Sequence, residues 1–131
     1  MIALLETLEL EHVAILNTLK AARMAGVHTE AGRELLVNAR ALIMEHLRKE
    51  DEFVYTRMHD DPEAGAVSDQ FCDEMRGLAP VLNTFFDKYE TSEHASEFSG
   101  ELGRLLGILQ KRITREEFLL YPTVRKAQTA A

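Results

Sequence analysis

His46 and Glu50 are four residues apart in a segment whose apolar residues recur at three- and four-residue spacing. On a helix, two residues at this spacing lie one turn apart on the same face. Arg112 and Glu116 repeat the spacing later in the chain, and His12 interrupts a similar apolar stripe near the start. Imidazole and carboxylate groups are ligands for iron, zinc and manganese. The pattern therefore indicates a metal site or a network of paired charges.

The helical spacing predicts that these ionisable side chains are buried, which is unusual for such groups. Charged side chains are costly inside a protein unless they are paired, hydrogen-bonded or bound to a metal. We expect a group of ionisable side chains at one depth of the core, made of His12, His46, Glu50, Arg112 and Glu116.

Four amphipathic segments must position this group, because apolar residues show the helical period and strand-like alternation is nearly absent. Gly26 is a candidate C-terminal cap, Thr29 an N-cap, Asp61-Pro62 a helix start, and Thr91 or Ser92 opens the last helix. Pro80 should kink the third helix. Short connections favour antiparallel neighbours, so we predict an all-α, antiparallel up-down-up-down four-helix bundle. It forms a single domain over residues 1–131, with helices at about 2–25, 30–59, 62–89 and 92–127.

The buried stripes follow from this periodicity. Polar residues interrupt three stripes at the same depth, and only the third stays apolar through its middle, with Glu74 at its edge. The predicted stripes are Leu5, Leu8, His12, Ile15, Leu19 and Ala22; Leu35, Ala39, Leu42, His46, Glu50 and Phe53; Phe71, Met75, Leu78, Leu82, Phe85 and Tyr89; and Phe98, Leu102, Leu105, Leu109, Arg112, Glu116 and Leu119.

An internal repeat relates the two halves of the chain. Residues 46–55 align with residues 112–121, so that two glutamates and two tyrosines fall in register and Arg112 takes the position of His46. A shorter match sets Met75 over His12. We interpret the second helix pair as a copy of the first in which both histidines have been replaced.

These motifs resemble the hemerythrin-like (HHE cation-binding) family. The resemblance rests on Glu11-His12, on His46-x-x-x-Glu50 followed by Phe53 and Tyr55, and on Arg-Glu-Glu-Phe-Leu-Leu-Tyr-Pro at residues 115–122, and it spans nearly the whole chain. It implies four antiparallel helices holding two non-haem irons, with histidines on all four helices and two bridging carboxylates.

When the family's ligands are matched position by position, the resemblance implies metal ligands for only one of the two irons. His12 and His46 match the histidines of one iron, Glu50 matches one bridging carboxylate, and Glu116 or its neighbour Glu117 matches the other. The histidine positions of the second iron hold Arg112, Met75 and Ala79. This departure argues against a full di-iron centre and against hemerythrin-style dioxygen binding.

The role of Arg112 distinguishes two hypotheses about whether the buried polar group holds a metal. A guanidinium cannot lose its proton to ligate a metal, and it repels a nearby dication. In one hypothesis Arg112 bridges Glu50 and Glu116, and the core is metal-free and self-compensated. In the other, Arg112 swings aside and His12, His46, Glu50 and Glu116 hold one divalent metal, iron, zinc or manganese.

The net charge and the composition argue against some classes of binding partner. A net charge of −7 without a basic cluster argues against nucleic acid and membrane surfaces. The start of the sequence has no leader pattern, and its single cysteine, Cys72, fits a reducing compartment, so we expect a cytoplasmic protein. Gly103 and Gly107 are weak evidence for a homodimer; the sequence names no protein partner.

The remaining candidates have simpler interpretations. His28, His59 and His94 fall at breaks or helix ends and are expected to be surface or capping residues. Tyr55 and Tyr121 are expected to pack at the bundle end, with hydroxyls reaching water or a backbone carbonyl.

Two functions follow from these assignments. The first is a hemerythrin-like protein that binds at most one divalent metal and senses or sequesters iron, oxygen, nitric oxide or a redox signal. The second is a metal-free regulatory or interaction module. A two-iron oxidase ranks third, because that chemistry normally uses both metals, so we do not expect an enzyme.

Overall fold

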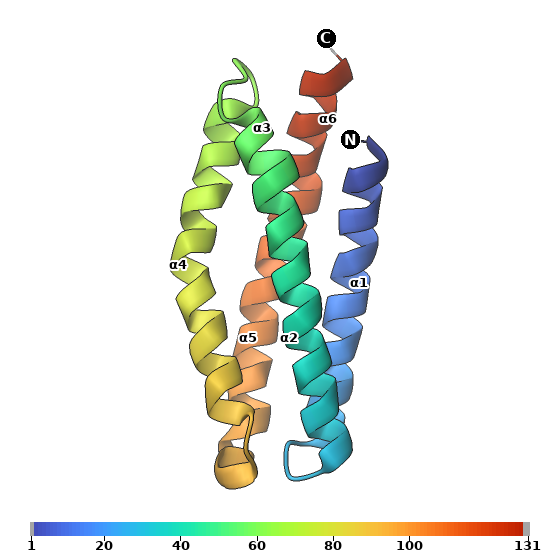
Figure 1. The fold of residues 1–131 in the computed structure, drawn as a ribbon, viewed down its shortest axis with the longest axis vertical. Coiled ribbons are helices and arrows are strands. Elements are labelled where there is room, and N and C mark those ends of the chain that lie inside the picture. Colours follow the sequence, from blue (N-terminus) through green and yellow to red (C-terminus); the bar gives the residue numbers. More distant parts are fainter. Residues whose placement is uncertain (1, 130–131) are drawn as a thin grey trace.

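Four helical rods run antiparallel to their neighbours in a computed structural model that describes residues 2–129. Two rods are composite: α2, η1 and α3 follow one another directly, and so do α5, η3 and α6. Figure 1 shows both termini at the same end of the bundle. The elements are α1 (Ile2–Ala25), α2 (Glu30–Glu50), the π-helical turn η1 (Asp51–Tyr55), α3 (Thr56–Met58), α4 (Gly65–Tyr89), the 3₁₀ turn η2 (Ser92–His94), α5 (Ala95–Arg115), the π-helical turn η3 (Glu116–Leu120) and α6 (Tyr121–Thr129). The predicted all-α bundle is confirmed.

The turn between α1 and α2 forms as the sequence predicts. Gly26 ends α1 with a φ of 78°, the left-handed conformation that glycine adopts without strain. Thr29 caps α2, because its Oγ1 accepts a hydrogen bond from the Gly32 amide at 3.0 Å. These local signals fix where the first helix ends and the second begins.

The third helix begins later than predicted. Asp61 accepts hydrogen bonds from the amides of Glu63 and Ala64 at 2.9 and 2.8 Å, but α4 starts only at Gly65. The aspartate therefore closes the turn that leads into the helix and is not the helix N-cap. At its other end, α4 runs to Tyr89, and it passes unbroken through the exposed Pro80.

The buried core consists of two apolar clusters. One contains Ile15, Leu19 and Leu109 among others, and the second contains Leu5, Leu8 and Tyr121. On α1, His12 falls between the residues of the two clusters, so the polar group lies where they meet.

Two predicted core leucines are exposed. Leu42 is 37% exposed and Leu119 is 45% exposed, while their neighbours Ile43 and Leu120 are buried. On α2 the inward face follows the spacing set by His46, which selects Ile43 three residues earlier. The π-helical turn η3 has i→i+5 hydrogen bonds and therefore contains one more residue than an α-helical turn. As a result Leu120, and not Leu119, faces the core.

No helix among residues 2–129 is both long and apolar enough to cross a membrane.

Candidate metal centre

One polar layer contains all five ionisable residues that the sequence singled out. His12 comes from α1, His46 and Glu50 from α2, Arg112 from α5 and Glu116 from the start of η3. Their exposed fractions lie between 0% for Glu50 and 7% for Arg112. The predicted burial of these side chains is therefore confirmed, and three helical rods contribute to the layer.

Ligand atoms of the two histidines and two glutamates converge. His12 Nε2 lies 2.8 Å from Glu116 Oε1, and His46 Nε2 lies 3.0 Å from Glu50 Oε1 and 4.0 Å from Glu116 Oε1. The ligand atoms of His12, His46 and Glu116 all lie within 4.8 Å of one another. Bonds from a divalent metal to nitrogen or oxygen are about 2.0–2.2 Å long, so one cation fits among these atoms.

The far sides of both imidazoles face carboxylates. His12 Nδ1 lies 2.6 Å from Glu117 Oε2, and His46 Nδ1 lies 2.9 Å from Glu11 Oε1. Lys49 in turn pairs with Glu11. A carboxylate that accepts the Nδ1–H of a histidine leaves the Nε2 lone pair free for a metal, which is the usual outer shell of metal-binding histidines. Both Nε2 atoms are oriented in this way toward the centre of the layer.

Two atoms of the centre lack a well-formed hydrogen bond within residues 2–129. They are His46 Nε2 and Glu50 Oε1, which are close enough to form an ion pair but poorly aligned. Buried polar atoms are rarely left without a partner, and a bound ion is one common explanation. The donor set and these two atoms together fit a divalent metal.

Electrostatic coupling sets the protonation of the centre when only protein groups are considered. Burial lowers the pKa of His46, but the nearby carboxylates of Glu116 and Glu50 outweigh it and raise that pKa to about 10. Burial and the nearby Glu116 charge raise the pKa of Glu50 to about 7. Burial also raises the pKa of Glu116, but the hydrogen bond to His12, the nearby His46 and the charge of Arg112 hold that pKa below its ordinary range. A proton on His46 therefore compensates the buried carboxylates.

Arg112 contacts the centre from one side only. Its Nε donates to Glu116 Oε2 at 3.0 Å, and its Nη2 donates to the Tyr55 hydroxyl at 2.8 Å and to the Phe71 carbonyl at 3.0 Å. Its Nη1 lies 3.3 Å from Glu74 Oε2. Among the described residues Arg112 forms no hydrogen bond or ion pair with Glu50, so the hypothesised bridge between Glu50 and Glu116 is not formed. The competing acceptors on η1 and α4, the Tyr55 hydroxyl, the Phe71 carbonyl and the Glu74 carboxylate, hold the guanidinium away from Glu50.

Both tyrosines of the repeat take part in the polar layer, whereas the sequence predicted packing at the bundle end with hydroxyls that reach water or a backbone carbonyl. The Tyr121 hydroxyl lies 3.3 Å from His12 Nε2, from Glu50 Oε2 and from Glu116 Oε1. Tyr55 accepts the hydrogen bond from Arg112. In an α-helix, residue i+5 lies about 140° around the axis from residue i. The wider π turns η1 and η3 bring Tyr55 and Tyr121 back toward the face of Glu50 and Glu116.

The positions that resemble the second metal's ligands do not supply ligands. Met75 lines a cavity of about 30 Å³ together with His12, His46, Glu50 and Arg112. That volume holds about two or three water-sized groups, since one needs about 10–15 Å³. Neither the thioether of Met75 nor the guanidinium of Arg112 adds an imidazole or carboxylate, so the ligand atoms around this cavity come from the two histidines and the glutamates.

Several residues of the centre were missed or left open by sequence reasoning. Glu116 points its carboxylate into the layer, whereas Glu117 supports His12 from outside, which separates the two alternatives for the bridging carboxylate. The supporting roles of Glu11 and Lys49 were not foreseen, although each directly neighbours a singled-out residue in the sequence. The other histidines, His28, His59 and His94, lie outside the layer, as expected.

Comparison of the sequence with known protein families gives a match. The family model described as the hemerythrin HHE cation binding domain matches residues 3–124. No curated protein and no solved structure matches the chain.

Proposed function

Because the chain belongs to the hemerythrin HHE cation-binding domain family, we propose that it binds a single divalent metal through His12, His46, Glu50 and Glu116. We propose iron as the metal, since two imidazoles and two carboxylates form a suitable set for it. The protein would act in sensing or sequestering iron or a small ligand of iron, and not as a di-iron oxygen carrier.

The orientation of the two histidines carries this proposal. Each imidazole is held at Nδ1 by a carboxylate, Glu117 for His12 and Glu11 for His46, and each directs Nε2 to the same point. A core that only needed to satisfy two buried histidines could do so with one acceptor each. Here four carboxylates surround two imidazoles, which supplies both ligands and outer-shell support.

Arg112 supports a stoichiometry of one. Its guanidinium keeps its positive charge and is 7% exposed, so it raises the energy of a second cation nearby. It also holds Glu116 Oε2, which leaves Oε1 facing His12. Tyr121 donates a hydrogen bond toward Glu50 or Glu116 and so orients these carboxylates. When bound, the metal would supply a Lewis acid and, in the case of iron, a position for a small ligand.

The alternative function is a metal-free regulatory or interaction module. It is favoured by one observation, that Arg112 pairs with Glu116 while a protonated His46 faces Glu50, so the buried charges compensate each other. In this alternative the polar layer fixes the packing of the helices and has no ligand.

Anaerobic titration of chelator-treated protein with Fe²⁺, followed by calorimetry, separates the two functions. We expect about one Fe²⁺ per chain, and we expect His46→Ala to lose that binding because an Nε2 ligand is removed. The matched control is His59→Ala, since His59 is exposed and lies outside the polar layer. This variant should bind as the parent does.

Absence of Fe²⁺ binding, with an unchanged melting temperature on adding Fe²⁺, Zn²⁺ or Mn²⁺, would favour the metal-free module. The sensing role needs a second measurement. Nitric oxide added to the Fe²⁺ protein should give an iron–nitrosyl electron paramagnetic resonance signal, and its absence would show that no coordination position is accessible.

A further inference from the structure

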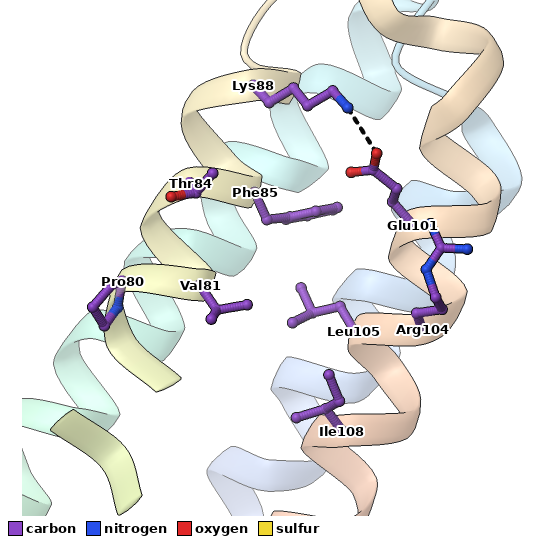
Figure 2. A pocket seen from close by; sticks show the side chains of 9 residues that line it. All are labelled: Pro80, Val81, Thr84, Phe85, Lys88, Glu101, Arg104, Leu105 and Ile108. Carbon is purple, nitrogen blue, oxygen red and sulfur yellow. Dashed lines mark hydrogen bonds and ion pairs between the residues drawn. The ribbon is translucent and has the colours of Figure 1, made fainter. Parts of the chain in front are cut away.

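A long groove separates α4 from α5 on the outside of the bundle. Figure 2 shows Val81 and Phe85 on α4 facing Leu105 and Ile108 on α5 across the opening, with Lys88 and Glu101 joined at one end. Val81 is 50% exposed and Ile108 is 46% exposed, although both point into this opening. The two helices pack mainly on other elements and leave the space between them open.

The groove extends beyond the part drawn in Figure 2. A hollow of about 490 Å³ adjoins a second of about 790 Å³, and Ile108 lines both. The second hollow continues past Leu78 to the ion pair between Glu74 and Arg115. From Glu74 to Lys88 an α-helix rises about 21 Å, which equals the length of about 14 helical residues. The groove thus has the length of a helix of four turns.

The charge of this groove is opposite to that of the protein. The chain has a net charge of −7, yet five basic and only two acidic side chains line the two hollows. Lys88 is paired with Glu101 at 2.7 Å and Arg115 with Glu74, but Arg104 and Lys111 make no ion pair within residues 2–129. An apolar floor beside free basic side chains is complementary to an acidic amphipathic surface.

Gly107 gives independent support for close approach by another chain. A Cβ placed at Gly107 would meet no atom within 4 Å, and this glycine lines the second hollow. Glycine within a helix is destabilising relative to alanine, and no contact among residues 2–129 requires it here. A missing side chain at this position instead leaves room for a helix backbone to approach α5.

We propose that the α4–α5 groove is a docking site for an acidic amphipathic helix of a protein partner. The apolar side chains of that helix, spaced three and four residues apart, lie against Val81, Phe85 and Ile108. Its acidic flank faces Arg104 and Lys111. The open shape of the groove suits a helix laid along it, because a helix contacts both walls without needing to be enclosed.

The test uses a designed peptide as the probe. A fluorescent, helix-stabilised peptide of about 18 residues carries leucines at helical spacing on one face and glutamates beside them. Its partner peptide has a lysine in place of each glutamate. Binding is measured by fluorescence anisotropy with the full chain. We expect the acidic peptide to bind at least about tenfold more tightly than the basic one, with an affinity that falls as salt increases.

Substitutions on α5 test whether the peptide binds in the groove. Gly107→Leu fills the open space beside α5 and should weaken binding about tenfold or more, while circular dichroism shows an unchanged helix content. The matched control is Gly100→Leu, because a Cβ at Gly100 also meets no atom within 4 Å but Gly100 lines neither hollow. A double variant, Arg104→Glu with Lys111→Glu, should reverse the preference between the two peptides.

Equal binding of both peptides, or no effect of Gly107→Leu, overturns the proposal. A second copy of the chain is the competing occupant, and sedimentation velocity distinguishes it. A dimer that dissociates in the Gly107→Leu variant would assign the groove to self-association, whereas a monomer throughout supports an external partner.

Discussion

Replacing Arg112 with methionine removes one partner from the buried charge network without leaving a large cavity. Methionine is unbranched and flexible, so it can follow the path of the arginine stem through the core, although it ends short of the guanidinium position. The change deletes the hydrogen bonds to Glu116, to the Tyr55 hydroxyl and to the Phe71 carbonyl. Glu116 is 2% exposed, so its carboxylate is shielded from bulk water when the guanidinium is lost. The carboxylate therefore keeps its desolvation cost and loses its closest permanent positive charge.

The size of the effect follows from this loss. Removing one partner of a buried ion pair typically costs about 3–5 kcal/mol. For a chain of 131 residues, each kcal/mol corresponds to a melting temperature change of about 3–5 °C. The chelator-treated variant should therefore melt about 9–25 °C below the parent, and its urea midpoint should fall with an unchanged m-value.

Thermal and urea unfolding followed by far-ultraviolet circular dichroism measure this change. The matched control is Arg104→Met, because Arg104 is exposed and makes no ion pair within residues 2–129; its melting temperature should stay within a few degrees of the parent. Adding Fe²⁺ or Zn²⁺ should recover more stability in the Arg112→Met variant than in the parent, because a dication replaces the missing positive charge beside Glu116.

A melting temperature within about 3 °C of the parent would refute the argument that Arg112 compensates Glu116. Equal stabilisation of parent and variant by metal would separately contradict the inferred repulsion between the guanidinium and a bound cation.

Three further predictions test the outer shell, the second metal position and a surface pair. Glu117→Gln should weaken Fe²⁺ binding about 10–100-fold in calorimetry, because His12 loses its charged Nδ1 acceptor; an unchanged affinity would contradict the outer-shell role. Arg112→His should raise the metal content above one per chain by elemental analysis, since it removes a positive charge and adds a ligand, and an unchanged content would mean that Arg112 does not exclude a second metal. Asp69 accepts a hydrogen bond from His59 and raises the pKa of that imidazole. The pair therefore stabilises the fold below the ordinary pKa of histidine and loses this effect as pH rises through the folded-state value. Asp69→Asn should lower the pKa of His59 in a nuclear magnetic resonance titration; if it does not, the hydrogen bond is absent in solution.

Periodicity was enough to predict the bundle and the depth of the polar layer. Apolar residues at helical spacing placed His12 and His46 on inward faces, because burial of an amphipathic stripe leaves little choice of rotation. Caps at Gly26 and Thr29 were predictable for a similar reason, since their signals act within a few residues of the chain.

Features that depend on packing between helices could not be predicted from the sequence. Leu119 was predicted to be buried and is exposed, because the π turn η3 changes the helical register after Glu116. Nothing in residue spacing signals that turn, which depends on how the neighbouring helices pack. The same turn brings Tyr121 into the polar layer, where its hydroxyl lies near both glutamates.

The sequence by itself determined which residues could make a metal centre, because a guanidinium cannot ligate a metal and four other donors lie on inward faces. The tertiary structure decided how those residues pair. It placed Glu117 behind His12 and Glu11 behind His46, and it directed Arg112 to Glu116 instead of to both carboxylates. These pairings join residues far apart in the chain, and they depend on the rotation and separation of whole helices. Local spacing cannot specify either quantity, so the burial of these side chains was predictable while their pairing was not.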